Sequence, residues 1–177
     1  MGLSECSSDS LRRACAVHPI VAVESEYSLL THDVEKEILP LTKELGVTLV
    51  PFSPLGRGLV TNTINVNTLE EHDFRKHLPR YNGKYWENNQ KLAIEIAEIA
   101  ESKGITPAQL ALAWILAQSE NIIPIPGTKH IKYLEENAKA VDVNLSTEDV
   151  SNIQLLLKKY PNIGNRYNEY DFQFVNK

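Results

Sequence analysis

The sequence predicts an α/β fold in which helices cover a parallel sheet. Three short apolar runs, rich in β-branched residues and bounded by turn formers, indicate buried strands over Ile20 to Glu24, Val47 to Phe52 and Ile122 to Ile125. Helical patterns separate these runs, and no hairpin signal joins two of them. Strand and helix therefore alternate, which favours parallel strands joined by helical crossovers.

Two helices are predicted in the first quarter of the chain. One spans Asp9 to Val17, with Ser7 or Ser8 able to cap its first turn. The other spans about Asp33 to Leu45. It should end at Gly46, because glycine most easily takes the left-handed conformation that closes a helix.

Four more helices follow the second strand. The first runs from about Glu87 to Lys103 and is closed by Gly104. Thr106 caps the second, and Gln109 is placed to complete a capping box. This helix is apolar nearly all round, so it should be sandwiched between other elements. The last two helices span about Ile131 to Val141 and Thr147 to Lys159, the latter capped by Ser146 with Asp149 three residues on.

Two segments lack a regular pattern. Gly56 to Asn89 scatters Gly, Asn and Pro among aromatic residues, which is typical of a lid or a binding loop, with disorder as the alternative. The tail, Pro161 to Lys177, is too aromatic for a plain solvated terminus. We expect it to dock on the body of the protein or on a partner. Its aromatic residues are Tyr167, Tyr170, Phe172 and Phe174.

Length, charge and composition exclude several classes of protein. The chain has 177 residues, 42% of them hydrophobic, which fits one globular domain. The net charge is −5 and no Lys/Arg cluster exceeds a pair, so neither nucleic acid nor a membrane surface is an expected partner. No apolar stretch approaches the about 18 residues of a membrane helix, and no signal peptide is recognised, so the expected location is cytoplasmic. Cys6, Cys15 and five histidines show no metal-ligand spacing, so no metal site is predicted.

Functional residues of parallel α/β folds lie at the C-terminal ends of strands. The first strand ends in Glu24 and Glu26, two apart on one face. We interpret them as ligand-binding or salt-bridging groups, with an acid/base couple as the alternative. The sequence contains no G-x-S-x-G elbow and no evident Ser/His/Asp arrangement, so no catalytic residue is assigned.

Two segments are candidate phosphate sites. Gly56-Arg57-Gly58 lets the backbone approach a bound group, and Ser53 offers a hydroxyl nearby. Thr61 stands where a G-x-G-x-x-G fingerprint has its third glycine, so a plain tight turn is the alternative. Before the helix that follows the third strand, Thr128 should be the cap and Lys129 should lie in the first turn, where N–H groups attract anions. A solvated lysine is the alternative there.

Five motifs, in order and over essentially the whole chain, resemble the C-terminal half of the aldo-keto reductase superfamily. They are Gly2-Leu3-Ser4-Glu5, Val23-Glu24-Ser25-Glu26-Tyr27-Ser28-Leu29-Leu30, Phe52-Ser53-Pro54-Leu55-Gly56-Arg57-Gly58-Leu59, Thr106 to Trp114, and Ile125-Pro126-Gly127-Thr128-Lys129 followed by Leu134-Glu135-Glu136-Asn137. The pyridoxal-reductase-like branch is the most similar. The resemblance implies the C-terminal portion of a (β/α)8 TIM barrel, about strands 6–8 with their helices. Residues 1–177 would then form one partial domain from which the N-terminal half of the barrel is absent.

The family transfers a hydride from NADPH to a carbonyl, so the resemblance implies an NADP site. Ser4 and Glu24 match residues that hydrogen-bond the nicotinamide carboxamide, and Phe52 matches a ring that stacks on the nicotinamide. The residues that match the pyrophosphate segment are Ser53, Leu55, Gly56 and Arg57. Those that match the adenosine 2′-phosphate and adenine pockets are Thr128 and Lys129, and Glu136 and Asn137, respectively.

The chain departs from the family pattern at three cofactor positions. Glu5 stands where the family usually has Asn, and Glu24 where it has Gln. A carboxylate accepts a hydrogen bond from the carboxamide N–H2 but cannot donate one to its oxygen. Tyr133 stands where many relatives have an arginine, which leaves Lys129, with His130, to supply positive charge to the 2′-phosphate.

The resemblance also implies that the family's catalytic Asp, Tyr, Lys and His belong to the first four strands, before Met1. We therefore assign no proton donor and keep three hypotheses. In the first, the chain is the cofactor half of a reductase of aldehydes or ketones, such as pyridoxal or aryl aldehydes, incomplete through gene-model truncation or a split gene. In the second, it is a non-catalytic half-barrel that binds nucleotide or pairs with a chain that completes the barrel. In the third, it is a degenerate remnant whose open strand edges would aggregate.

Overall fold

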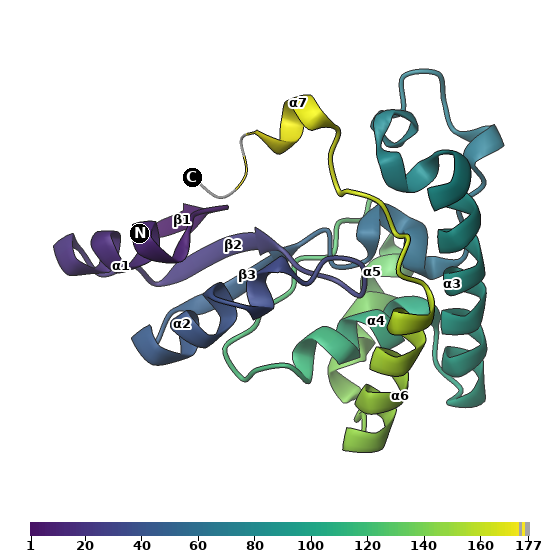
Figure 1. Cartoon of the computed structure of the whole chain (residues 1–177). Helices are drawn as coiled ribbons and strands as arrows, with labels where there is room; N and C mark the ends of the chain where they lie inside the picture. The colour runs from purple at the N-terminus through teal and green to yellow at the C-terminus, as the bar shows by residue number, and fades with distance from the viewer. Residues whose placement is uncertain (174, 176–177) are drawn as a thin grey trace.

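A parallel sheet of three strands lies at one end of the computed structural model, which describes residues 1–173 and 175 (Figure 1). The strands are β1 (Gly2–Ser4), β2 (Ala22–Glu26) and β3 (Thr48–Phe52), in the spatial order β1-β2-β3. Both pairings are parallel. The predicted α/β class, with a parallel sheet and helical crossovers, is confirmed.

The strand at the N-terminus is absent from the prediction. Gly2–Ser4 pairs with β2, but three residues are too few to show a strand period in the sequence. The predicted strands over Ile20 to Glu24 and Val47 to Phe52 are confirmed with shifts of one or two residues at their ends.

The last predicted strand, Ile122 to Ile125, is wrong in extent. The N–H groups of Ile123 and Ile125 each donate to a carbonyl of β3 at 3.0 Å, but only Ile122 forms a ladder bridge, to Leu49. Pro124, between the two donors, has no N–H to offer on the other side. The segment therefore behaves as the edge of the sheet, which is where proline is tolerated.

The first two predicted helices differ in how well they match the structure. Helix α1 (Ser8–Val17) is capped by Ser7, as one of the two alternatives predicted. The predicted helix over Asp33 to Leu45 is broken into a 3₁₀ turn, Asp33–Glu35, and α2 (Ile38–Leu45). Pro40 explains the break, because deeper in a helix its ring would clash with the carbonyl one turn back, whereas in the first turn its missing N–H costs nothing. Gly46 closes α2 in the left-handed conformation, with φ of 66°, as predicted.

The later helices confirm the capping predictions. Thr106 and Gln109 form a capping box on α4, and Ser146 and Asp149 form one on α6. These helices are α3 (Gly83–Ser102), α4 (Pro107–Leu116), α5 (Ile131–Ala138), α6 (Thr147–Lys159) and α7 (Glu169–Phe172). Helix α3 begins four residues before the predicted start. Helix α5 gives way to a 3₁₀ turn at Lys139–Asp142, inside the range predicted as one helix.

One face of the sheet is covered along its length, whereas the other is exposed at Ser4 and Glu24 and is covered only at the strand end, where Glu26 is buried. Val23 and Leu49 are fully buried, whereas Glu24, which follows Val23 on the opposite face, is exposed. Figure 1 shows α3, α4 and α6 stacked at one end of the molecule, with the sheet, α1 and α2 at the other. Helix α4 lies in the core and has 7 of its 10 residues buried, which confirms its sandwiched position. We call the side of the sheet that carries Glu24 the open face.

The end of β2 is linked to α4 by aromatic packing. The ring centroids of Tyr27 and Trp114 lie 5.6 Å apart, and both side chains are fully buried. The Tyr27 hydroxyl donates to Glu35 at 2.9 Å, and His32 Nδ1 lies 2.7 Å from the same carboxylate oxygen. Burial alone would lower the pKa of His32, but its hydrogen bond and charge interaction with Glu35 outweigh that effect and raise it.

The irregular stretch after β3 is folded rather than disordered. It contains four short 3₁₀ turns: η2 (Gly56–Thr61), η3 (Val66–Thr68), η4 (Phe74–His77) and η5 (Pro79–Tyr81). The expectation that the tail docks on the body of the protein is met in part: Arg166 is only 3% exposed and Tyr167 packs against the core, whereas the aromatic residues Tyr170 and Phe172 are exposed. Phe174 lies outside the described residues. Within the part of the chain that the structure describes, no helix is long and apolar enough to span a membrane.

Candidate functional site

The strand ends and three distant segments meet at one buried carboxylate, that of Glu26. Its side chain has no exposed surface, and guanidinium nitrogens of Arg57, Arg80 and Arg166 lie 2.9, 3.3 and 3.7 Å from its oxygens. The hydroxyl of Thr31 also donates to it, at 3.0 Å. The interpretation of Glu26 as a salt-bridging group is therefore confirmed.

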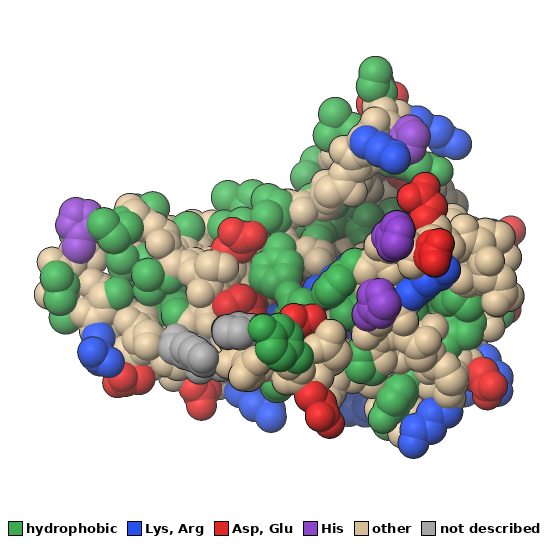
Figure 2. All heavy atoms as spheres, turned by 90° about the horizontal axis from the view of Figure 1, so that it is seen from above, with side chains coloured by type: hydrophobic (Ala, Val, Ile, Leu, Met, Phe, Trp, Pro, Cys, Tyr) green, Lys and Arg blue, Asp and Glu red, His purple; other side chains and the backbone are tan. Residues whose placement is uncertain are grey.

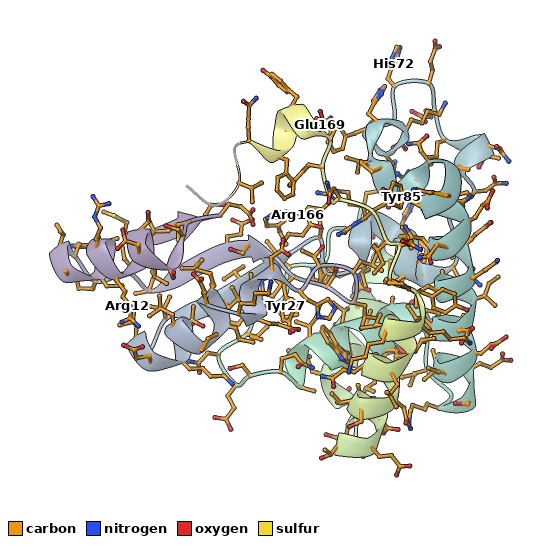
Figure 3. All side chains as sticks on the ribbon, viewed as in Figure 1. Arg12, Tyr27, His72, Tyr85, Arg166 and Glu169 are labelled. Carbon is orange, nitrogen blue, oxygen red and sulfur yellow. The ribbon has the colours of Figure 1, made fainter. Side chains whose placement is uncertain are left out.

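Glu5 completes this arrangement, which we call the Glu26 cluster: Glu5, Glu26, Arg57, Arg80 and Arg166. Arg166 Nη2 donates to Glu5 Oε2 at 2.7 Å, and the other oxygen of Glu5 accepts from the backbone N–H of Glu26 at 2.9 Å. Figure 3 shows Arg166 near the middle of the molecule, on the C-terminal segment and above Tyr27. The cluster thus joins the ends of β1 and β2 to the loop after β3 and to the tail.

Positive charge exceeds negative charge in the buried part of this cluster. Three guanidinium groups face two carboxylates, while Asp33, 3.7 Å from Arg166 Nε, has a side chain that is 57% exposed. Burial lowers the pKa of Arg80. For Arg166 burial acts in the same direction, but the hydrogen bond that it donates to Glu5 and the charges of Glu5 and Glu26 outweigh burial and raise the pKa. The ring of Tyr167 lies under both Arg57 and Arg166, at 5.0 and 5.4 Å, and adds a cation–π contact to each.

The turn after β3 has a backbone that few residues can adopt. Gly56, Arg57 and Gly58 all have positive φ, of 56°, 55° and 93°. The positive φ favours glycine at position 56, and a Cβ atom there would lie 2.7 Å from Leu30 Cδ1, so that side chain would also have to shift. The Gly56-Arg57-Gly58 turn, one of the two predicted phosphate sites, therefore has an unusual backbone conformation and packs against Leu30, shortly after β2.

The other predicted phosphate site borders a cavity of about 410 Å³, which we call the Thr128 cavity. It lies between the loop after β3 and the first turns of α4 and α5. Its lining includes four of the predicted cofactor residues, Leu55, Thr128, Glu136 and Asn137, together with Thr61, Thr63, Thr106, Pro107, Ala108, Gly127, Lys132 and Tyr133. The lining therefore combines hydroxyl groups, an amide, an ammonium group and the carboxylate of Glu136 with apolar walls.

The predicted geometry around Lys129 is wrong. Helix α5 begins at Ile131 with His130 as its N-cap, so Thr128 is not the cap and Lys129 is not in the first turn. Instead, Thr128 Oγ1 accepts from the N–H of His130 at 3.1 Å and closes a turn before the helix. Lys129 therefore lies in the turn before the helix, and Lys132, in the first turn of α5, lines the cavity instead.

The predicted nicotinamide residues lie together on the open face of the sheet. Ser4 pairs with Glu24 in the parallel register, and both side chains are exposed. Glu24 pairs with Val50, and Phe52 follows Val50 on the same face. Ser53, Leu55, Gly56 and Arg57 form the connection from this face to the Thr128 cavity, although the Arg57 guanidinium itself is bound to Glu26.

Two groups of residues at these sites are missing from the prediction. Arg80 and Arg166 approach Glu26 from 54 and 140 positions along the chain, and no local pattern signals such a contact. Lys132 lies in the first turn of α5, whose start at Ile131 matches the predicted range. The error is to take Thr128 as the cap, which places Lys129 instead of Lys132 in that turn.

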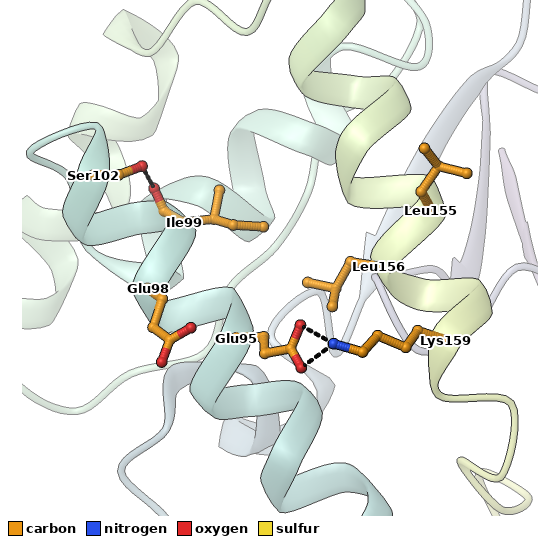
Figure 4. Close-up of a pocket in the computed structure, with 7 residues that line it drawn as sticks. All are labelled: Glu95, Glu98, Ile99, Ser102, Leu155, Leu156 and Lys159. Atoms are coloured by element: carbon orange, nitrogen blue, oxygen red, sulfur yellow. Dashed lines mark hydrogen bonds and ion pairs between the residues drawn. The ribbon is translucent and has the colours of Figure 1, made fainter.

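A second hollow, of about 470 Å³, lies between α3 and α6 and contains none of the predicted residues. Figure 4 shows Glu95 on α3 facing Lys159 on α6, joined by hydrogen bonds of 2.6 and 2.9 Å. It lies on the outer helices, away from the strand ends. Elsewhere in the described residues, no three His, Cys, Asp or Glu side chains gather as a metal site would require.

Comparison with known proteins defines the family. The family model named "Aldo/keto reductase family" matches residues 1–158. A Glycine max protein named "Probable aldo-keto reductase 1" is 46% identical over 153 residues, covering 86% of this chain and 44% of its own. A Schizosaccharomyces pombe protein named "Aldo-keto reductase yakc [NADP(+)]" is 43% identical over 171 residues, covering 94% and 50%.

Solved structures agree with the sequence relatives. A glycerol dehydrogenase from Gluconobacter oxydans superposes with a TM-score of 0.84 at 22% identity, covering 90% of this chain and 49% of that one. The thermostable aldo-keto reductase Tm1743, solved with the inhibitor epalrestat, gives a TM-score of 0.64 at 29% identity, covering 88% and 47%. These neighbours are barrels, and the structure is consistent with part of a (β/α)8 barrel.

The chain belongs to the aldo/keto reductase family, whose members are oxidoreductases. It spans about half the length of the curated relatives it matches.

On the face shown in Figure 2, Lys and Arg side chains are scattered among acidic and hydrophobic ones and form no single basic patch.

Replacing Glu26 by glutamine should destabilise the fold strongly. Glu26→Gln keeps the shape of the side chain but leaves the buried arginines without their shared counter-charge, so the free energy of unfolding should fall by about 3–5 kcal/mol. Urea unfolding followed by circular dichroism measures this change. Glu95→Gln, which breaks the exposed pair with Lys159, is the matched control and should change stability little. Equal effects of the two substitutions would contradict the assignment of Glu26 as the central charge.

Proposed function

We propose that the chain provides the NADP-binding half of a reductase that reduces aldehyde or ketone carbonyls. The observation that carries this proposal is the Thr128 cavity, placed beside the strand-end turn in a chain of the aldo/keto reductase family. The name of the yeast relative, which includes NADP(+), supports the choice of cofactor. In the whole barrel, β1, β2, β3 and the 121–125 segment would be the last four strands.

The donor set of the Thr128 cavity fits the adenosine 2′-phosphate end of NADP. The Lys132 ammonium and the Thr128 hydroxyl supply positive charge and a hydrogen bond for a phosphate, and the first turn of α5 adds its N–H groups. The Asn137 amide and the walls formed by Leu55 and Pro107 suit a heteroaromatic base. Lys132 thus replaces Lys129 as the cation of this site.

The open face suits the nicotinamide end of the cofactor. Ser4 and Glu24 are neighbours in register, so a serine donor and a carboxylate acceptor are both available to a carboxamide. Glu24 stands where the resemblance implies a glutamine, and Ser4 compensates for this difference because it supplies the hydrogen-bond donor that a carboxylate lacks. Phe52, next along the same face, offers an aromatic surface for stacking. When bound, NADPH supplies the hydride.

Charge at position 132 should decide the preference for NADP over NAD. Lys132→Ala should weaken binding of NADP⁺ by about tenfold, because a charged contact to the 2′-phosphate is lost, and should leave the binding of NAD⁺ unchanged. Isothermal titration calorimetry with both nucleotides measures this effect. Lys129→Ala removes the same charge three residues away and is the control. A loss of NADP⁺ affinity in Lys129→Ala but not in Lys132→Ala would contradict the proposal.

The isolated chain should not reduce carbonyls. Tyr27 and Tyr81 are buried, burial raises the pKa of both, that of Tyr81 to about 12, and their hydroxyls already donate within the protein. They are therefore poor general acids. Assays of NADPH oxidation with pyridoxal and with aryl aldehydes should show no turnover above background. Turnover that disappears when any tyrosine of this chain is replaced by phenylalanine would contradict this expectation.

A further inference from the structure

The segment from Asp73 to Asn82 folds back onto the turn after β3. Tyr81 is 3% exposed, and its hydroxyl lies 2.8 Å from the carbonyl oxygen of Gly56 and 3.2 Å from that of Arg57. The single hydroxyl proton is therefore shared between two carbonyls of the turn.

Residues before and after Tyr81 in the sequence hold its ring in place. It stacks on Trp86 with a centroid distance of 6.1 Å and an interplanar angle of 16°. Its neighbour Arg80 donates to the carbonyl of Leu30 and to Thr31, each at 2.9 Å, and pairs with Glu26. The hydroxyl is consequently held at one place relative to the end of β2.

A second donor meets the same turn. Arg75 Nη1 donates to the carbonyl of Arg57 at 3.4 Å, while its other nitrogens are held by Asp73 at 2.6 to 3.2 Å. These hydrogen bonds hold the pKa of Asp73 down, to about 2. Tyr81 and Arg75 therefore both occupy the carbonyl side of the turn.

Fixing the carbonyl groups also fixes the opposite side of the backbone. In a trans peptide group the C=O and the N–H point in opposite directions, so a Gly56 carbonyl turned toward Tyr81 turns the N–H of Arg57 away from it. The negative ends of two carbonyl dipoles are likewise kept away from any group bound on that opposite side. The N–H groups of Gly56 and Gly58 already donate to the carbonyls of Ser53 and Leu55, at 2.8 and 3.0 Å, so the Arg57 N–H is the donor that this geometry turns toward a bound anion.

We propose that Tyr81 is a positioning residue for the pyrophosphate of the cofactor: its hydroxyl holds the Gly56 and Arg57 carbonyls back and thereby turns the Arg57 N–H toward the pyrophosphate. The inference rests on the proposed function, because it assigns the turn to the pyrophosphate. Tyr81 acts through the backbone of the turn and need not touch the cofactor.

Two ligands separate the roles of the turn and the cavity. NADP⁺ contains both a pyrophosphate and a 2′-phosphate, whereas adenosine 2′-monophosphate contains only the latter. Each is titrated into the ¹⁵N-labelled full chain, and the dissociation constant is taken from amide chemical-shift changes. In the wild type, NADP⁺ should shift amides of both the turn and the Thr128 cavity, and adenosine 2′-monophosphate only those of the cavity.

Tyr81→Phe removes the hydroxyl and keeps the ring. It should weaken NADP⁺ binding by about five- to tenfold, the effect of one lost hydrogen bond, and leave the affinity for adenosine 2′-monophosphate unchanged. Tyr27→Phe is the control, since its equally buried hydroxyl donates to Glu35 instead. A general loss of structure would weaken both ligands, so this selectivity distinguishes positioning from folding.

The outcomes decide between the two proposals. If the wild type binds neither ligand, the proposed function is wrong. If the wild type binds both and Tyr81→Phe binds NADP⁺ as tightly, the positioning role is wrong. Should Tyr81→Phe fail to fold, Arg75→Ala takes its place, because it removes the second donor from the Arg57 carbonyl and should show the same selective loss in smaller degree.

Discussion

The structure depends on the burial of one carboxylate, that of Glu26, among three arginines. Taking a charge out of water is costly unless partners surround it, and here the partners come from the loop after β3, from the turn before α3 and from the tail. Each of these segments also places apolar side chains in or against the core, among them Leu59, Leu78 and Tyr167. The shared electrostatic contact adds a common reference point for all three at the end of β2.

This arrangement accommodates the carboxylate of Glu5. A second carboxylate would be unfavourable beside Glu26, but Arg166 bonds to Glu5 at 2.7 Å and also lies 3.7 Å from Glu26. The tail and the end of β1 have therefore become dependent on each other. The same contact brings Tyr167 over Arg57, so the position of the turn that we assign to the pyrophosphate depends on the tail.

Local signals in the sequence predicted most of the elements. The capping boxes at Thr106 and Ser146 and the stop at Gly46 follow from hydrogen bonds and backbone conformations within a few residues, so sequence alone suffices for them. The failures have three physical causes. The strand Gly2–Ser4 is too short for a pattern, and Thr128 closes a turn before α5 instead of capping the helix, so Lys132 rather than Lys129 lines the cavity. The contacts of Arg80 and Arg166 are decided by tertiary packing, which no local pattern contains.

Hydrogen exchange in Glu26→Gln tests most directly whether this carboxylate holds the cofactor turn in place. Exchange is measured by mass spectrometry on the wild type and the variant, under conditions in which both remain folded. The account predicts that protection falls together in peptides covering 53–61, 79–82 and 163–167, while the capped helices α4 and α6 keep theirs. Loss of protection confined to β2, with the turn and the tail unchanged, would contradict it.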